Sequence, residues 1–186
     1  MVKAVFLDRD GTIIEDVGYL DSCDEIKFLP RVNEAIKLLN ENGFKVIIIT
    51  NQSGVARGYF TEATVKEINS YVQKSLSKQG AYIDRSYYCP HHIEGAIIQY
   101  KKECHCRKPN PGMIEEAARE LGIDLEDSFV IGDKLIDVEA GRRAGCSTIL
   151  LAGERYPNKW GETAVISDYT ATDLYEAVKW LTEQSR

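Results

Sequence analysis

Short hydrophobic runs alternate with longer amphipathic segments along this chain. The short runs, rich in β-branched and aromatic residues, predict strands at residues 4–7, 45–49, 86–88, 129–131, 148–151 and 164–166. The segments between them predict helices at residues 32–42, 62–78, 111–121 and 173–183. Strands that alternate with helices are typical of a parallel sheet covered by helices on both faces. The pattern therefore predicts an α/β protein with a doubly wound, Rossmann-like sheet.

Two long loops do not fit this alternation. Residues 13–29 carry many acidic side chains, and residues 90–110 carry all three histidines. In an open α/β sheet, ligands bind beyond the carboxyl ends of the strands, and long loops of this kind are often functional. We therefore expect both loops to border a binding site.

Length and composition restrict the classes of protein that fit. The 186 residues can bury one sizeable core, so we expect a single domain spanning 1–186. The net charge of −6 argues against a protein that tracks a nucleic-acid backbone. The first residues lack a signal-peptide core, and no segment is apolar enough to span a membrane. Five cysteines in such a chain suggest thiols or metal ligands, so we expect a cytoplasmic location. Separately, we expect a monomer.

Two carboxylates follow the first predicted strand directly. Asp8 and Asp10 stand two positions apart, so both side chains can point to one side. Like charges this close repel, and they persist together when a cation or a proton lies between them. Magnesium fits because it prefers oxygen ligands. The alternative is a solvated turn, since Asp-x-Asp-Gly is also ordinary turn chemistry.

Polar residues also follow other predicted strands. Thr50, Asn51, Gln52 and Ser53 offer hydroxyl and amide groups, which are good phosphate donors. Gly132-Asp133-Lys134 follows the strand at 129–131, with Asp137 one helical turn beyond Asp133. Arg107 and Lys108 precede a predicted helix N-terminus, which favours anions. Together, the strand ends supply acids for a metal and donors and cations for phosphate.

These residues resemble the four motifs of the haloacid dehalogenase superfamily: Asp8-x-Asp10-Gly11-Thr12, Thr50, Lys108, and Gly132-Asp133 with Asp137. Segments 6–13, 50–58, 89–92, 104–109 and 132–135 are similar to the D-glycero-D-manno-heptose 1,7-bisphosphate phosphatases in particular. The likeness extends over about Val5 to Ala144. No room is left between the motifs for a separate cap domain, so the site should be open.

The resemblance implies a role for each motif residue. Asp8 would be the nucleophile, and Asp10 the general acid and base. Magnesium would bind the side chains of Asp8 and Asp133 and the backbone carbonyl of Asp10. Thr50 and Lys108 would stabilise the transferring phosphoryl group.

Some of the expected substrate-binding residues are implied by the same family resemblance. Asp16, Gly18 and Tyr19 match family positions that line the substrate, although a hairpin turn also explains them. The remaining expected contacts are Asn51, Gln52, Ser53, Arg107, Lys108 and Lys134. Arg57 is either a substrate clamp or a surface charge.

Cysteine and histidine residues cluster in the second long loop, at about residues 89–109. Cys89, His91, Cys104 and Cys106 match a closed tetrahedral zinc site, although the spacing alone is only moderately specific. The family likeness favours His91 over the competing imidazoles of His92 and His105. Because four protein ligands leave no water to activate, this zinc should be structural and should stiffen the loop that carries Arg107 and Lys108. Cys23 and Cys146 read as small buried apolar groups.

The expected activity is removal of the C7 phosphate from D-glycero-D-manno-heptose 1,7-bisphosphate in heptose precursor biosynthesis. Histidinol-phosphate phosphatase is the nearest rival, and the continuation Ser53 to Gly58 favours the heptose enzymes. A polynucleotide 3′-phosphatase fits less well because the chain is acidic. A non-catalytic zinc protein that binds phosphorylated ligands is the alternative from another class, but it would not need the full set of motif residues.

Overall fold

The computed structural model describes residues 2–153 and 167–184, which contain one six-stranded sheet. Its strands are β1 (Ala4–Leu7), β2 (Lys45–Asn51), β3 (Arg85–Cys89), β4 (Phe129–Gly132), β5 (Ser147–Leu151) and β6 (Tyr169–Ala171). They lie in the order β3-β2-β1-β4-β5-β6, and every neighbouring pair is parallel. The predicted doubly wound parallel sheet is confirmed.

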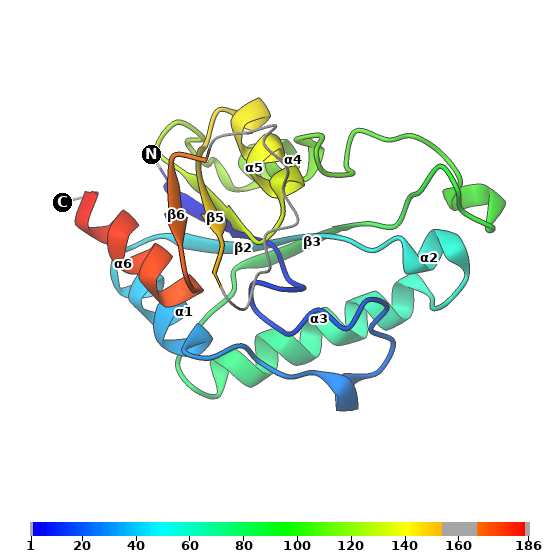
Figure 1. Cartoon of the computed structure of the whole chain (residues 1–186), viewed down its shortest axis with the longest axis horizontal. Helices are drawn as coiled ribbons and strands as arrows, with labels where there is room; N and C mark the ends of the chain where they lie inside the picture. The colour runs from blue at the N-terminus through cyan, green and yellow to red at the C-terminus, as the bar shows by residue number, and fades with distance from the viewer. Residues whose placement is uncertain (1, 154–166, 185–186) are drawn as a thin grey trace.

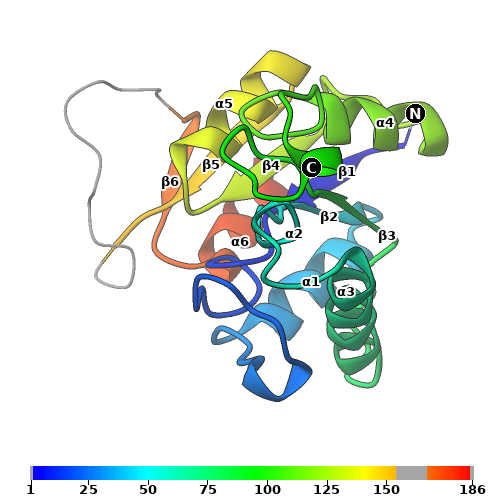
Figure 2. The ribbon, with the colours of Figure 1, turned by 90° about the vertical axis from the view of Figure 1, so that its right-hand side faces the viewer.

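Helices cover both faces of this sheet (Figures 1 and 2). Helices α1 (Val32–Glu41), α3 (Glu62–Ser77) and α6 (Leu174–Gln184) lie on one face, and α4 (Gly112–Leu121) and α5 (Leu135–Ala144) lie on the other. Successive side chains of a strand point to opposite faces, so Val5 and Leu7 pack in the core under α1, α3 and α6, whereas Phe6 packs against α4. Within the described residues, no helix has the length and apolar character that a membrane span requires.

Some elements of the structure were not predicted from the sequence. Helix α5 and the short helix α2 (Gly54–Arg57) were not predicted. The buried side of α5 includes Asp137 and Gly141, so it lacks the apolar stripe that identifies a helix in the sequence. The strand expected at 164–166 lies outside the described residues, and the sixth strand, β6, was not predicted.

The chain order reverses at β1, which has β2 on one side and β4 on the other. The carboxyl ends of these three strands meet at the crevice where ligands bind in open α/β sheets. The 13–29 loop, with a 3-10 helix η1 (Cys23–Glu25), follows β1, and the 90–110 loop, with η2 (Ile98–Tyr100), follows β3. Along residues 2–153, no insertion forms a separate cap domain.

Candidate active site

Three carboxylates converge at the carboxyl ends of β1 and β4. Asp8 follows β1, Asp133 follows β4, and Asp137 lies in the first turn of α5. One oxygen from each lies within 4.8 Å of the others. The sequence placed Asp8 and Asp133 together correctly, because parallel strands deliver their carboxyl ends to one edge of the sheet.

Lys108 is buried among these acids. Its Nζ lies 2.7 Å from Oδ1 of Asp8 and 2.7 Å from Oδ1 of Asp137. It also donates a hydrogen bond of 2.8 Å to the carbonyl of Ile49 at the end of β2. Burial acts to lower the pKa of Lys108, but the Asp137 and Asp8 carboxylates outweigh it, and the pKa is raised. Lys108 therefore carries a fixed positive charge beside the Asp8 carboxylate.

The same cluster has the chemistry of a site for a hard divalent cation. Oδ1 of Asp133 is buried without a hydrogen-bond partner among the described residues. Burial, followed by the nearby Asp8 charge, raises the pKa of Asp133 to about 7. Asp137 already uses Oδ1 on Lys108 and accepts a hydrogen bond of 3.1 Å from the backbone N–H of Lys134 through Oδ2. Asp8 and Asp133 are thus the carboxylates best placed to bind a cation.

Gly11 gives the site its close packing against β4. Its φ is +89°, and a Cβ at this position would lie 2.4 Å from Oδ2 of Asp133. Glycine permits both the positive φ and the close approach of the backbone to the carboxylate. The glycine of the Asp-x-Asp-Gly segment is therefore part of the geometry of the acidic cluster.

We expect Gly11→Ala to weaken the binding of a divalent cation more than it impairs folding. The positive φ should cost about 1 to 3 kcal/mol of the free energy of unfolding. The new methyl group should also displace the Asp133 carboxylate, so half-saturation should require more Mg²⁺. Calorimetric titration with Mg²⁺, together with thermal unfolding, measures both effects.

Gly145→Ala is the matched control, because Gly145 has φ +86° and, apart from its chain neighbours, no atom of the described residues lies within 4 Å of the position that a Cβ would take there. It should show the loss of stability without the change in Mg²⁺ requirement. An equal change in Mg²⁺ requirement in both variants would contradict the role assigned to the Gly11–Asp133 contact.

Asp10 points toward polar groups at the end of β2. Its Oδ2 accepts hydrogen bonds from Nε2 of Gln52 at 2.9 Å and from Oγ1 of Thr50 at 3.3 Å. Burial raises the pKa of Asp10 above its ordinary value, against the opposing charge of Arg9. A raised pKa is what a carboxyl group that donates a proton requires.

Asn51 connects β2 to the backbone of Lys108. Its Nδ2 donates to the Lys108 carbonyl at 3.0 Å, and its Oδ1 accepts from the Lys108 N–H at 3.1 Å. Both ends of the amide are thus engaged, so Asn51 positions Lys108 in addition to any contact with a ligand. Ser53, which precedes α2, makes no side-chain capping hydrogen bond.

The 13–29 loop reaches the same crevice through an ion pair. Nζ of Lys134 lies 2.8 Å from Oδ2 of Asp16 and 4.0 Å from Oδ2 of Asp133. The N–H of Gly18 donates to Oδ1 of Asp16 at 2.9 Å, which forms a local turn in a bend that no strands flank, so the hairpin expected as an alternative is not formed. Tyr19 is 46% exposed and packs edge-to-face on Tyr59 at 4.6 Å between ring centroids. The loop therefore combines a turn with side chains at the border of the crevice.

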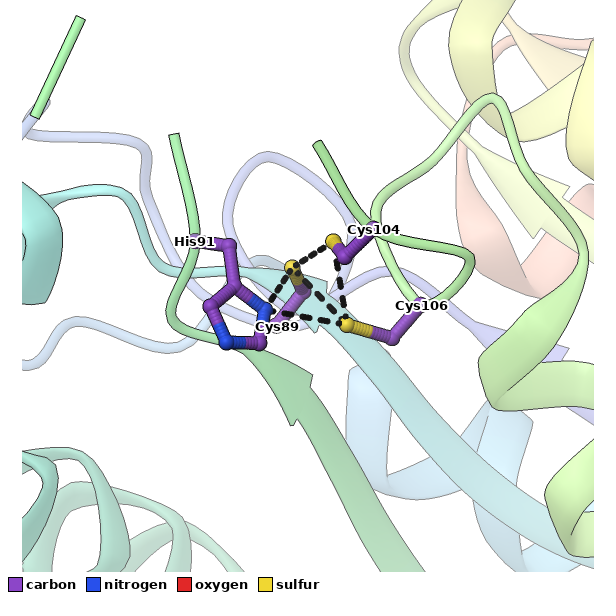
Figure 3. A group of neighbouring side chains, drawn as sticks. All are labelled: Cys89, His91, Cys104 and Cys106. Atoms are coloured by element: carbon purple, nitrogen blue, oxygen red, sulfur yellow. Dashed lines mark hydrogen bonds between the residues drawn. The ribbon is translucent and has the colours of Figure 1, made fainter. Parts of the chain in front are cut away.

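The predicted cysteine and histidine ligands come together (Figure 3). Sγ of Cys106 lies 3.2 Å from Sγ of Cys89 and 3.2 Å from Sγ of Cys104, and Nδ1 of His91 lies 3.4 Å from Sγ of Cys106. Hydrogen bonding from Cys89 lowers the pKa of Cys106 to about 5. Three sulfurs and one imidazole nitrogen within 4.8 Å of one another form a set that can bind a metal ion.

The structure also separates the three histidines. Nδ1 of His92 accepts a hydrogen bond from the N–H of Glu94 at 3.1 Å, and His105 pairs with Glu115 at 2.6 Å. Only His91 belongs to the sulfur cluster of the described residues. Its backbone carbonyl accepts a hydrogen bond of 3.2 Å from Arg107, which ties the two halves of the loop together. Arg57 pairs with the exposed Glu94 at 3.4 Å.

Three contributions to this site were not identified from the sequence. These are the ion pair of Asp137 with Lys108, the burial of Arg9, and the contact of Arg9 with Asn69. Asn69 carried a weak signal, because it is a polar residue beside the apolar stripe of α3. Arg9 belongs to segment 6–13, which resembles the heptose phosphatases, but nothing in the sequence pattern indicated that its side chain is buried.

Comparison with known proteins places this geometry in context. A family model described as HAD-hydrolase-like matches residues 105–177. The D-glycero-β-D-manno-heptose-1,7-bisphosphate 7-phosphatase of Photorhabdus laumondii subsp. laumondii is 42% identical over 180 residues, which cover 96% of each chain. The D-glycero-D-manno-heptose-1,7-bisphosphate 7-phosphatase of Chlorobaculum tepidum is 42% identical over 183 residues, which cover 95% of this chain and 92% of that one.

A solved structure is also similar over nearly the whole chain. The D,D-heptose 1,7-bisphosphate phosphatase from B. bronchiseptica, complexed with magnesium and phosphate, has a TM-score of 0.85 and 32% identity. The match covers 98% of this chain and 99% of that chain.

Proposed function

We propose, from the premise that this chain belongs to the D-glycero-D-manno-heptose-1,7-bisphosphate 7-phosphatases, that it hydrolyses the C7 phosphate of this sugar and leaves the 1-phosphate. The observation that carries the proposal is the buried contact of Lys108 with Asp8, at 2.7 Å, beside Asp133. A carboxylate held next to a fixed cation and a second acid is arranged for phosphoryl transfer. A protein that only binds phosphate has no need for such a nucleophile.

In the first step, a carboxylate oxygen of Asp8 attacks phosphorus. The bond between phosphorus and the C7 oxygen breaks, and the leaving alkoxide takes a proton from Asp10. Lys108 stabilises charge on the phosphoryl oxygens, and the hydroxyl of Thr50, which donates to Asp10 at 3.3 Å in the structure, turns to donate to a phosphoryl oxygen when substrate is bound. The products of this step are the sugar 1-phosphate and an aspartyl phosphate on Asp8.

In the second step, water attacks the aspartyl phosphate. Asp10, now ionised, accepts a proton from that water, and the bond between Asp8 and phosphorus breaks. Inorganic phosphate leaves, and both carboxyl groups return to their starting protonation states. Burial raises the pKa of Asp10 above its ordinary value, against the lowering effects of Arg9 and of the hydrogen bond from Gln52, and a raised pKa suits a group that alternates between acid and base.

Magnesium fits the residues of the acidic cluster. The side chains of Asp8 and Asp133 and the backbone carbonyl of Asp10 would bind it, and the unpartnered Oδ1 of Asp133 supports this assignment. When bound, the ion offsets the negative charges of the carboxylates and the phosphate.

We assign zinc to the cluster of Cys89, His91, Cys104 and Cys106. With all four positions occupied by protein, this zinc is structural. Its task is to hold the loop that carries Arg107 and Lys108, because Cys106 immediately precedes both residues in the chain.

The second phosphate of the substrate requires a further anion site. We call the loop at about residues 89–109 the zinc loop. It lines a cavity of about 640 Å³ through residues that include Lys102, Arg107 and Lys108. Arg107 and the Ser53 hydroxyl are the expected donors to the 1-phosphate. Asp16, Gly18, Tyr19 and Lys134 are the expected contacts for the sugar, and Gln52 and Asn51 hold Asp10 and Lys108 in place.

We expect Arg107→Ala to narrow the preference for the bisphosphate over a sugar monophosphate. A hydrogen bond from the guanidinium to phosphate is worth about 1.5 to 3 kcal/mol, so kcat/KM for the bisphosphate should fall about 10- to 100-fold. A monophosphate cannot use this contact, and its kcat/KM should change little. Phosphate release from both substrates measures the ratio.

Arg119→Ala, which removes an exposed arginine from α4, is the control and should leave both values unchanged. Equal losses on both substrates in Arg107→Ala would show that Arg107 acts on the reacting phosphate or on the loop as a whole.

The substrate is tested by comparing kcat/KM for the heptose bisphosphate and for histidinol phosphate on the same enzyme. A clear preference for the heptose bisphosphate supports the proposal. A preference for histidinol phosphate would keep the phosphatase mechanism and reject the sugar.

We further propose that residues 1–186 form one domain and act as a monomer in the cytoplasm. The continuous six-stranded sheet supports a single domain. The metal site needs reduced cysteines, which a cytoplasmic location provides.

A further inference from the structure

Arg9 is buried to an extent that is rare for arginine. Its side chain is 1% exposed, and it is among the largest fully buried side chains of the described residues. Arginine is almost never buried this deeply unless its charge and its N–H groups are paired. The partners of Arg9 therefore indicate why the chain keeps it here.

One partner is the neighbouring carboxylate of Asp10. Nε and one terminal nitrogen of Arg9 donate to Oδ1 at 3.2 and 3.1 Å, and the same terminal nitrogen lies 3.0 Å from Oδ2. The planar guanidinium thus holds both oxygens of Asp10 in a fork, which fixes the orientation of a carboxylate as well as its position.

The other partner comes from a distant part of the chain. The remaining terminal nitrogen of Arg9 donates to Oδ1 of Asn69 at 3.0 Å. Asn69 lies on α3, on the side that Val65, Ile68 and Val72 bury against the sheet, and it is 5% exposed. An asparagine in such a place costs stability unless it is hydrogen-bonded, and Arg9 supplies the donor.

We propose that Asn69 and Arg9 are positioning residues that hold the carboxyl group of Asp10 in the orientation it uses as acid and base. The inference rests on the role of Asp10 in the proposed function. Arg9 holds the carboxylate from one side, and Gln52 and Thr50 hold Oδ2 from the end of β2. A group that transfers a proton must be aligned with the leaving oxygen, and rigid neighbours provide that alignment.

Asn69 is the residue to change, because it touches Arg9 and does not reach Asp10 directly through any hydrogen bond of the described residues. Asn69→Leu keeps the branched shape of the side chain, although leucine is larger, and removes the acceptor, so the guanidinium loses its anchor on α3. Asn69→Ala is a smaller second variant in case leucine prevents folding. Asn69→Asp keeps an oxygen acceptor and should restore the wild-type behaviour.

The readout is sensitivity to the leaving group. An alkyl phosphate such as the heptose bisphosphate needs a proton on its leaving oxygen, whereas p-nitrophenyl phosphate releases a stable phenolate that needs almost none. Asn69→Leu should lower kcat/KM for the alkyl ester about 10-fold, because general acid catalysis contributes about 10²- to 10⁴-fold and only part of it is lost. The kcat/KM for p-nitrophenyl phosphate should stay within about twofold of wild type. The comparison uses kcat/KM because this constant reports the steps up to departure of the leaving group and excludes breakdown of the aspartyl phosphate, in which Asp10 acts as a base on both esters.

Val72→Ala is the matched control, because Val72 is buried on the same side of α3. It should lower the melting temperature and leave the ratio of the two kcat/KM values unchanged. Asp10→Asn should also lower kcat/KM for the alkyl ester selectively, and by a larger factor than Asn69→Leu.

The two esters and the variants at Asn69 and Asp10 together test the inference. A selective loss on the alkyl ester in Asn69→Leu, restored in Asn69→Asp, supports the inference. If Asp10→Asn shows the selective loss but Asn69→Leu loses activity equally on both esters, or on neither, the inference is overturned. Absence of selectivity in Asp10→Asn would overturn the acid role in the proposed function, and the inference with it. If wild type does not hydrolyse the heptose bisphosphate, the substrate is rejected, and the same ratio measured with another sugar phosphate still tests Asn69.

Discussion

Asp8→Asn is expected to abolish phosphate release while the protein remains folded. The amide has nearly the shape of the carboxylate but lacks the negative charge that attacks phosphorus. Removal of a nucleophile that works as a unit with its partners costs several orders of magnitude, so kcat should fall by about 10³-fold or more. Phosphate release from the heptose bisphosphate, with circular dichroism on the same sample, measures activity and fold together.

The same variant should respond less to magnesium. In wild type, burial and the nearby Asp8 charge disfavour the charged form of Asp133, and a bound cation relieves this repulsion. Mg²⁺ should therefore raise the melting temperature of wild type, as any ligand of the native state does. Asp8→Asn has fewer charges to neutralise, and its melting temperature should rise less.

Asp127→Asn is the control for both measurements, because Asp127 is an exposed aspartate that lies 3.9 Å from Lys3. It should match wild type in activity and in response to Mg²⁺. Substantial turnover by folded Asp8→Asn would remove Asp8 from the role of nucleophile, whatever its response to the metal.

The parts of the site that the sequence predicted are those fixed by the topology of the sheet. Asp8, Thr50 and Asp133 each stand at or just beyond the end of a hydrophobic run, and parallel strands bring such ends to one edge. The hydrophobic periodicity predicts the fold. The proximity of these residues follows because parallel strands end at the same edge of the sheet.

The parts that the sequence did not predict depend on which side chains meet across the crevice. The approach of Lys108 to Asp137 requires the zinc loop and α5 to come together, and neither segment has a regular hydrophobic pattern. The double hydrogen bond of Asn51 with the Lys108 backbone has the same origin. Such contacts depend on loop conformation, which periodicity does not encode.

The zinc loop was predicted from the sequence in part. Its ligands were recognisable as residue types at short spacing, but the preference for His91 over His92 rested on family position. The structure supplies a physical reason, since Nδ1 of His92 accepts a hydrogen bond from Glu94 within a local turn. A ligand set whose members come from both ends of a loop of this length must lose that arrangement when the chain unfolds.

Cys104→Ser should therefore lower the stability of the protein sharply and reduce its zinc content. Binding of a structural zinc is part of the folding free energy, because the four ligands come together only in the native chain. Loss of a structural metal belongs to the few changes that cost about 4 kcal/mol or more. For a chain of this size, that loss corresponds to a fall in melting temperature of roughly 8 to 16 °C. Thermal unfolding, with metal analysis of the purified protein, measures both effects.

Cys23→Ser is the matched control, since Cys23 is also partly exposed and lies outside the sulfur cluster. It should keep the zinc content and nearly the full melting temperature. Cys104→Ser should also lose activity, because Arg107 and Lys108 follow the cluster immediately and depend on the loop for their position. Metal analysis that finds no zinc in wild type purified without chelators would reject the zinc site. A Cys104→Ser variant that loses zinc but keeps full activity would show that the loop positions Lys108 through Asn51 and the acidic cluster alone.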